Sequence, residues 1–313
     1  MPELPDVQTI VTTLQPLVGR RVGTVRVLRG DIVRGEAVDF GKFAKGRKIR
    51  AIRRQAKRII FDLGGERRIQ FHLGMTGQLT VCKRSHALQK HTHLRIGIAG
   101  TKDELRFRDV RRFGGVWLLN DSHVNDQGAA GGMKSRLVGS LRESSQGEND
   151  TLAGRSRRLK PAAPWDSRGL GPLGPDALEI TLREFRRLLC RNRQIKALLL
   201  DQTAIGGLGN IYVDESLYKA RVHPLTKAAE LGAEQIKKLH GAMRRTLHSA
   251  IKAGGSTIRD YRTPNGERGW FQTRHQVYGR EGQPCRRCKA PIERIQAAGR
   301  SSHICPNCQQ IEK

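Results

Sequence analysis

Four cysteines near the C-terminal end constrain the fold of this 313-residue chain more than any other feature. They form two C-x-x-C pairs with sixteen residues between them: Cys285, Cys288, Cys305 and Cys308. This is the spacing of a zinc ribbon or hairpin finger, in which four thiolates hold a tetrahedral Zn²⁺. Two disulfide bonds are the alternative. Because the other two cysteines, Cys82 and Cys190, are isolated, the distribution favours one structural zinc in a reducing compartment.

Basic residues outnumber acidic ones by two to one along the whole sequence. Lys and Arg total 58 against 29 Asp and Glu, which gives a formal charge of +29. So large and so distributed an excess predicts a polyanionic partner. We expect nucleic acid and no membrane partner, because the sequence has no long apolar run, no signal-peptide pattern and no basic amphipathic anchor. The expectation is a soluble, cytoplasmic protein.

The apolar pattern divides the chain into two unlike halves. Helical spacing over residues 5–17 is followed by alternation over 22–119, which predicts a largely antiparallel sandwich or barrel. Periodicity disappears over 122–169, a Gly-, Ser- and Arg-rich stretch that we interpret as a flexible, disordered insertion, with nonspecific DNA contact as the alternative.

Helical signals return in the second half. Thr181 and Glu184 form a T-x-x-E capping box, and helices are predicted over 195–200, 214–220 and 236–251, the last one ending at Gly254-Gly255. The length suits two domains plus a small module, with one compact domain as the alternative.

The N-terminal sequence Met1-Pro2-Glu3 carries candidate chemistry. If Met1 is removed, Pro2 becomes a free secondary amine, and an α-amino group has a pKa of about 8. Secondary amines condense with sugar aldehydes, and the adjacent Glu3 is placed to exchange protons with the group attacked. The alternative is a common chain start without chemistry.

Two further segments suggest phosphate contacts. The glycine-rich turn at residues 206–212 offers backbone amides before a helix, although such a turn is more often a simple connection. Between the cysteine pairs, Arg300 is expected at a hairpin tip, where a guanidinium can hold a phosphate, with an ordinary solvated arginine as the alternative.

Six motifs in one order resemble the bacterial formamidopyrimidine-DNA glycosylases, the Fpg/Nei family. Beside the cysteine module they are PELPDV at 2–7, AK at 56–57, HLGMTG at 72–77, DVRRFG at 109–114 and GLGNIY at 207–212. The resemblance runs over nearly the whole chain except about 122–165. Asp6 and Val110 replace the family's commoner Glu and Pro, and the insertion is unusual.

The resemblance implies an α+β multidomain fold. It consists of an N-terminal antiparallel β-sandwich with flanking helices, a helix-two-turn-helix domain and a C-terminal four-cysteine zinc finger. The expected boundaries are 1–121 for the catalytic sandwich, 122–169 for the linker and insertion, 170–255 for the helical domain, 256–276 for a lesion-recognition loop region and 277–313 for the zinc-finger module.

The implied activity is that of a bifunctional DNA glycosylase and abasic-site lyase of base excision repair. Its substrates would be 8-oxoguanine and formamidopyrimidines in damaged double-stranded DNA. Pro2 matches the family's amine nucleophile, which forms a Schiff base, and Glu3 matches the acid that protonates the opening sugar. Lys57 and Arg300 match residues that act in β- and δ-elimination. A monomer associated with the nucleoid is expected.

The resemblance also assigns DNA contacts. Met75, Arg111 and Phe113 match residues that fill the gap left by a flipped base, and their types suit wedging and hydrogen bonding. Read alone, Met75 and Phe113 are more often core residues. Residues matching backbone-contact positions are His91, Arg111, Arg191, Lys196 and Asn210.

Two alternatives stay open. An endonuclease VIII-like enzyme would act on oxidised pyrimidines, but Leu4 and the gap-filling set argue against it. A non-catalytic DNA-binding protein would keep the zinc and the charge, but it would not need Pro2, Glu3 and Lys57 together.

Overall fold

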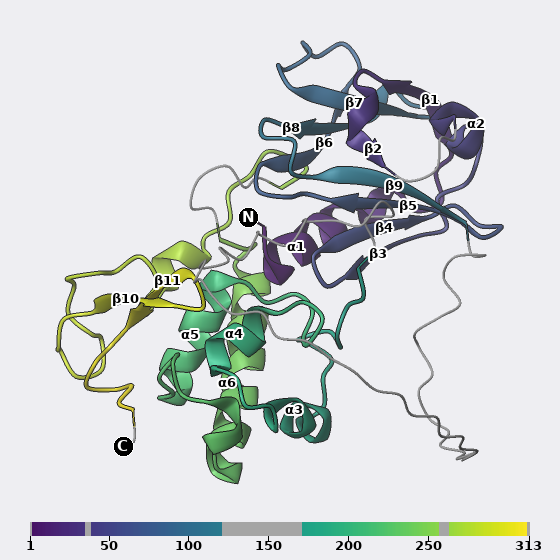
Figure 1. Cartoon of the computed structure of the whole chain (residues 1–313). Helices are drawn as coiled ribbons and strands as arrows, with labels where there is room; N and C mark the ends of the chain where they lie inside the picture. The colour runs from purple at the N-terminus through teal and green to yellow at the C-terminus, as the bar shows by residue number, and fades with distance from the viewer. Residues whose placement is uncertain (1, 35–38, 121–170, 257–262, 312–313) are drawn as a thin grey trace, which may run out of the picture.

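The computed structural model describes residues 2–34, 39–120, 171–256 and 263–311 (Figure 1). The insertion predicted at 122–169, and residues 257–262 of the predicted lesion-recognition region, lie outside the described residues. In Figure 1 a β-sandwich occupies the upper part, helices the lower part and a small hairpin module the left side, with the N-terminal helix between them.

Two sheets form the N-terminal sandwich. The strand order is β1-β7-β8-β6 in one sheet and β2-β9-β5-β4-β3 in the other. The strands are β1 Val22–Val27, β2 Val33–Arg34, β3 Ala51–Gln55, β4 Arg58–Asp62, β5 Arg67–His72, β6 Gly77–Lys83, β7 Thr92–Ile98, β8 Asp103–Asp109 and β9 Gly115–Asn120. All neighbouring pairs are antiparallel except β2 and β9, which are parallel. The prediction of an antiparallel sandwich is therefore confirmed with one parallel pair at an edge.

Helix α1 (Leu4–Leu14) connects the two large hydrophobic cores. Leu4 is buried among helical residues of the second half, whereas Val7, Ile10 and Leu14 are buried in the sandwich core. Proline at the second helical position suits a first turn, because its missing N–H would have no partner there. The helix continues as a 3-10 turn, Gln15–Leu17, and a short helix α2 (Phe40–Ala44) packs on the sandwich. The residues next to the N-terminus are thus fixed at the junction of the two cores.

The second half is helical: α3 Leu182–Leu189, α4 Ile195–Leu200, α5 Asn210–Ala220 and α6 Ala233–Lys252. The capping box is confirmed, since the Glu184 N–H donates to Thr181 Oγ1 and the Thr181 N–H to the Glu184 carboxylate. Helix α5 begins four residues before the predicted start, directly after the glycine turn. None of the helices in the described ranges is long and apolar enough to span a membrane.

The C-terminal module is a hairpin of β10 (Glu293–Ala297) and β11 (Arg300–Ile304). A two-residue turn joins them, and both turn residues, Ala298 and Gly299, have positive φ, which matches the twist of a tight hairpin. The module has its own small core around Cys285, Cys305 and Tyr218 of α5. Arg300, which was predicted at the tip itself, is the first residue of β11 directly after the tip.

Candidate active site and nucleic-acid interface

Glu3 lies buried where the sandwich meets the helical half, with only 3% of its surface exposed. Its carboxylate accepts hydrogen bonds from the backbone N–H groups of Ile211 (3.1 Å) and Tyr212 (3.4 Å), in the first turn of α5. First-turn amides have no partner within their helix, and the helix dipole favours a negative charge there. Burial raises the pKa of Glu3, against the opposing effects of Lys57 and the two amides. The carboxyl group is thus fixed, and its protonated form is made more accessible.

The glycine-rich turn before α5 makes room for Glu3. A Cβ atom at Gly209 would lie 2.3 Å from Glu3 Cδ, and one at Gly207 would lie 2.5 Å from Leu4 Cδ1. Gly207 also has a φ of +107° and accepts a hydrogen bond from the Leu4 N–H at 3.1 Å. The sequence suggested a phosphate cradle, but the amides that follow this turn bind the Glu3 carboxylate.

Lys57 occupies the two-residue turn between β3 and β4 and is 7% exposed. Asp176 fixes this hairpin on the helical half, because its carboxylate pairs with Arg54 and accepts the Ala56 N–H at 3.1 Å. Burial lowers the pKa of Lys57 to about 8; Arg300 acts in the same direction and Glu3 in the opposite one. Glu3 and Arg300 are thus near enough to Lys57 to act on its charge, and the buried Pro2 directly precedes Glu3.

Asp6 connects this cluster to the start of the predicted lesion-recognition region. Its Oδ2 accepts the Glu3 N–H at 2.7 Å, and its Oδ1 accepts the Ser256 N–H at 2.8 Å. Burial raises the pKa of Asp6 to about 7, against the effect of the two amides. Further along, the carbonyl oxygen of Pro264 accepts the Val81 N–H at 3.1 Å at the β6 edge. Ser256 is thus attached to the N-terminal end of α1, and Pro264 to the edge of the sandwich.

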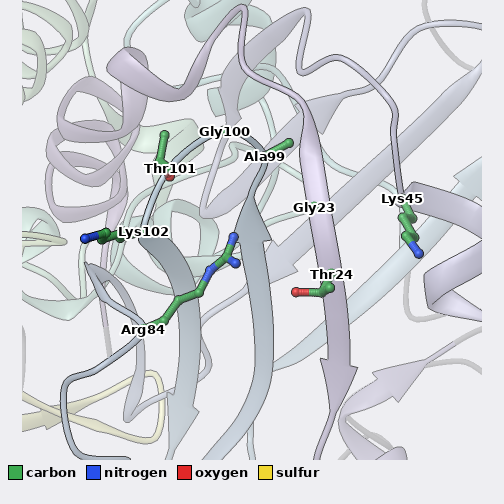
Figure 2. Close-up of a pocket in the computed structure, with 8 residues that line it drawn as sticks. All are labelled: Gly23, Thr24, Lys45, Arg84, Ala99, Gly100, Thr101 and Lys102. Atoms are coloured by element: carbon green, nitrogen blue, oxygen red, sulfur yellow. The ribbon is translucent and has the colours of Figure 1, made fainter.

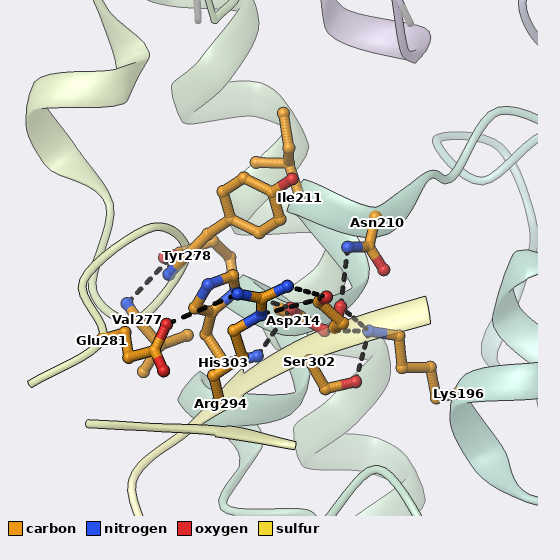
Figure 3. A network of polar contacts seen from close by, with 12 residues as sticks. Lys196, Asn210, Ile211, Asp214, Val277, Tyr278, Glu281, Arg294, Ser302 and His303 are labelled. Carbon is orange, nitrogen blue, oxygen red and sulfur yellow. Dashed lines mark hydrogen bonds and ion pairs between the residues drawn. The ribbon is translucent and has the colours of Figure 1, made fainter. Parts of the chain in front are cut away.

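A buried polar network fixes the hairpin that carries Arg300 (Figure 3). Asp214 of α5 accepts hydrogen bonds from Lys196 Nζ at 2.7 Å and from the His303 N–H at 3.0 Å. Lys196 Nζ also donates to the Ser301 carbonyl at 3.1 Å and to the Ser302 hydroxyl. Helices α4 and α5 therefore hold β11 directly behind Arg300, whose own side chain is exposed.

The prediction that Lys196 contacts the DNA backbone is wrong for this structure. Its side chain has no exposed surface, and its ammonium group is occupied by Asp214 and by β11. An unpaired buried ammonium would be costly, so the residue serves the interior of the protein instead. Asn210, another predicted contact, is partly exposed and donates from Nδ2 to the Ser301 carbonyl at 2.9 Å. It is the first residue of α5, and this bond connects the helix to β11 of the finger.

The three predicted gap-filling residues come together on two neighbouring loops. Met75 is 43% exposed and Phe113 is 47% exposed, so neither is a core residue. The Arg111 guanidinium lies 4.6 Å from the centre of the Phe113 ring and donates to Met75 Sδ at 3.4 Å. The Arg111 N–H donates to Thr76 Oγ1, which bonds to Asp109, so the two loops are tied together. These exposed side chains form a wedge of the kind that can enter a base stack.

The remaining predicted contacts occupy separate places. His91 is partly exposed just before β7, and its positive φ of 67° fits a turn. Arg191 is exposed between α3 and α4, and its side chain forms no hydrogen bond with another described residue.

The four cysteines fit a zinc ion. Their Sγ atoms all lie within 4.8 Å of one another, as four ligands of one tetrahedral metal require. Cys285 and Cys305 are fully buried, and the Tyr218 hydroxyl lies 3.2 Å from Cys285 Sγ. The four thiolates would hold one structural Zn²⁺, and the Tyr218 contact places this site against α5.

Models of known families match three segments of the chain. They are the formamidopyrimidine-DNA glycosylase N-terminal domain over residues 1–116, its H2TH domain over 173–262, and the zinc finger found in FPG and IleRS over 282–311. A formamidopyrimidine-DNA glycosylase of Solibacter usitatus is 37% identical, with 99% of this chain and 100% of the relative covered. The chain belongs to the formamidopyrimidine-DNA glycosylase family.

Solved structures agree with this assignment. A Lactococcus lactis FPG variant bound to Fapy-dG-containing DNA matches with a TM-score of 0.79 at 31% identity, covering 99% of this chain and 100% of that one. Thermus thermophilus MutM (FPG) matches with a TM-score of 0.75 at 35% identity, covering 98% of both chains. The predicted fold of sandwich, H2TH domain and zinc finger is confirmed.

Sequence reasoning missed residues whose partners are distant in sequence. His72 is next to Lys57, and burial lowers its pKa to about 4, with Arg58, Lys57 and Arg34 adding to the effect. Its Nδ1 accepts the Gly74 N–H at 3.2 Å. Asp214 gave no local signal of any kind. Asp6 could have been found from the sequence, because an acidic residue three positions after Glu3 fits a helix N-terminal capping box.

Proposed function

We propose that this protein is a bifunctional glycosylase and abasic-site lyase that removes oxidised purines from double-stranded DNA. Family membership gives the coarser statement, a DNA glycosylase of DNA repair. The finer proposal rests chiefly on one observation: a buried carboxyl group, Glu3, is held by α5 beside Pro2 and Lys57. A protein that only bound DNA would have no need of this arrangement.

In the proposed reaction, Met1 has been removed and the Pro2 nitrogen attacks C1′ of the damaged nucleoside. Glu3 gives a proton to the sugar ring oxygen as the ring opens, and the base leaves with the electron pair of the glycosidic bond. The resulting iminium ion makes the 2′ hydrogens acidic. Loss of a 2′ proton expels the 3′ phosphate by β-elimination, and a second elimination expels the 5′ phosphate.

Lys57 and Arg300 are the proposed assistants of elimination. The leaving phosphates carry negative charge, which an ammonium and a guanidinium stabilise. A pKa of about 8 lets Lys57 donate a proton near neutral pH. The position of Arg300 beyond a fixed hairpin tip supports this assignment.

Met75, Arg111 and Phe113 are proposed to fill the gap that the extruded base leaves. Extrusion costs a few kcal/mol. Intercalating side chains offset part of that cost, since they restore stacking and hydrogen bonding. Their exposure and mutual contacts support this role. We also propose that the DNA backbone is contacted by His91, Arg191 and Asn210.

The proposed domain boundaries follow residues 121, 169, 255 and 276.

The proposed substrates are 8-oxoguanine and formamidopyrimidines. Similar structures support this class, since they are complexes with Fapy-dG-containing and carbocyclic 8-oxo-G-containing DNA. The test compares single-turnover cleavage of a duplex with 8-oxoguanine opposite cytosine and one with thymine glycol opposite adenine. We expect faster cleavage of the first. Preference for thymine glycol would assign the protein to oxidised pyrimidines, as in an endonuclease VIII-like enzyme.

A further inference from the structure

A row of arginines crosses the outer face of the β1-β7-β8-β6 sheet. Arg26 of β1 is directly opposite Arg95 of β7, which is directly opposite Arg106 of β8. Cross-strand partners share one face of a sheet, and like charges in such positions repel each other. The apolar partners of the same strands, such as Ile96 and Leu105, point into the sandwich core. The arginines are thus on the side facing away from the core.

One carboxylate, that of Glu104, forms ion pairs with two of these arginines. Glu104 is buried, and it bonds to Arg95 Nε at 2.9 Å and to Arg106 Nε at 2.6 Å. The other nitrogens of Arg106 donate to the carbonyl groups of His86 and Ala87. Arg26 is exposed, and its side chain has no hydrogen bond or ion pair with any residue that the structure describes. The row therefore carries an excess of positive charge that the protein does not neutralise.

The row borders two adjoining hollows, the larger of which is drawn in Figure 2. The larger one, of about 520 Å³, reaches from Lys45 to the β7–β8 turn at Lys102, and the smaller one, of about 320 Å³, lies over Arg26, Arg95 and Glu104. Thr24 and Arg84 line both, and Figure 2 shows Arg84 extended toward Thr24, with Lys45 and Lys102 on opposite sides.

Glycines keep this surface open. A Cβ atom at Gly97 would lie 2.8 Å from the Arg84 guanidinium and 3.0 Å from Thr24 Oγ1. The missing side chain leaves room for the Arg84 guanidinium, which donates to the Ile98 carbonyl at 3.0 Å. Its planar group is therefore presented in one orientation, as recognition of a phosphate requires.

The charge of the residues that line the two hollows indicates which class of ligand they bind. The two hollows are lined by five cationic side chains and one carboxylate, and that carboxylate, Glu104, is already paired. Among described residues, Lys45 and Lys102 have no side-chain partner, and the nearby Asp103 is paired with Lys83 at 2.8 Å. The site thus favours an anion with several oxygen atoms.

The position of the site favours DNA as the carrier of that anion. Strand β7 begins beside His91, at the same end of the sheet as the wedge loops, and ends at the larger hollow. Seven strand residues span roughly 20 Å. Arg108 and the arginine row occupy the face between these ends. Cations thus follow the sheet from the predicted lesion end to the hollow.

We propose that the arginine row and the two hollows bind phosphate groups of the DNA backbone outside the segment that holds the damaged base. This inference depends on the proposed function in one respect, namely that DNA is the partner. The surface contributes to searching and holding DNA, and it lies apart from Glu3 and Lys57.

The test is the salt dependence of binding to undamaged DNA by the full-length, zinc-loaded protein. Each phosphate contact contributes about 0.9 to the slope of log K against log salt concentration. The variant Arg26→Gln/Lys45→Gln/Lys102→Gln removes three exposed cations without a described partner. Its matched control, Lys237→Gln/Lys238→Gln/Arg244→Gln, removes three exposed cations from α6.

On a duplex of roughly three turns, we expect the slope of the triple variant to fall by about 1 for each phosphate group that it no longer binds. On a duplex of roughly one turn, its slope should equal that of the unmodified protein. Equal slopes for the triple variant and the α6 control on the long duplex would overturn the proposal. A second measurement is the ³¹P NMR signal of inorganic phosphate. If this signal broadens with the unmodified protein but not with the triple variant, while the DNA slopes stay equal, the site binds a free anion and the proposal is overturned.

Failure here is distinguishable from failure of the proposed function. Base excision from a short lesion duplex should be the same in the triple variant and in the unmodified protein, because the substitutions are far from Glu3. Absence of base excision by the unmodified protein would refute the glycosylase proposal. The salt-dependence slopes on undamaged DNA would still show whether the hollows bind DNA phosphates.

Discussion

Gly209 makes space for Glu3 by having no side chain. In Gly209→Ala, the new Cβ would lie 2.3 Å from Glu3 Cδ, so the carboxyl group must leave the amides of α5. We expect base excision to fall at least roughly tenfold, because general-acid catalysis contributes ~10²-fold or more. Single-turnover release of 8-oxoguanine measures this effect.

Gly232→Ala is the matched control. Gly232 also precedes the first turn of a helix with a negative φ, and an added Cβ would meet no atom within 4 Å. Excision by this variant should stay within about twofold of the unmodified protein. Equal losses in the two variants would show that the Glu3 position does not depend on Gly209.

Lys57 predicts a pH dependence. Burial lowers its pKa to about 8, so its proton is present below that pH and is lost as pH rises through 8. The proton-donating step of elimination should therefore slow above pH 8. In Lys57→Arg the guanidinium stays protonated, so the descending limb should move to higher pH even if the maximal rate is lower. Rates of strand cleavage at a preformed abasic site measure this limb, and an unmoved limb in Lys57→Arg would assign it to another group.

Among the elements, helix α5 makes two contacts that position the site. Its first-turn amides bind the Glu3 carboxylate, and Asp214, about one turn later, accepts a hydrogen bond from β11 of the finger. Asp214→Asn leaves the Lys196 ammonium buried without a counter-charge, and breaking such a pair costs about 3–5 kcal/mol. We expect a lower melting temperature and, because β11 carries Arg300, a smaller share of δ-elimination products.

Product ratios on an abasic-site duplex separate this effect from general destabilisation. Glu293→Gln, an exposed change on the same hairpin, should leave the ratio of β- to δ-products unchanged. An unchanged ratio in folded Asp214→Asn would show that the network does not position Arg300.

Local patterns predicted the elements, but not the contacts between them. The Thr181 capping box joins residues three positions apart, and the four cysteines lie within one short segment, so both could be predicted from the sequence. The resemblance places Lys196 among the DNA-backbone contacts, but its ammonium group is buried against Asp214, which belongs to another helix. The link from Asp6 to Ser256 joins residues 250 positions apart, a distance that no periodicity can bridge.

At the scale of the whole molecule, the described residues form three hydrophobic cores. The sandwich and helical cores share α1, and the zinc finger has its own small core. A core of this size does not support a fold without its metal. Stability should therefore depend on zinc in the finger and much less in the sandwich.

Zinc removal tests this division. We expect a chelator strong enough to remove the single Zn²⁺ to unfold the module around residues 282–311 and to abolish binding of lesion DNA. The amides of β4, β5 and β8 should keep their protection from hydrogen exchange. Native mass spectrometry confirms the metal loss, and exchange measured by mass spectrometry locates the unfolding. Simultaneous loss of protection in the sandwich would contradict the separation of cores.

The central claim is that the Pro2 nitrogen forms the covalent intermediate while Glu3 and Lys57 handle protons. Borohydride reduction during reaction with an 8-oxoguanine duplex, followed by peptide mapping, tests it most directly. We predict a trapped DNA adduct on Pro2 of chains that lack Met1. An adduct on Lys57, or none in a preparation from which Met1 has been removed, would contradict the proposed mechanism.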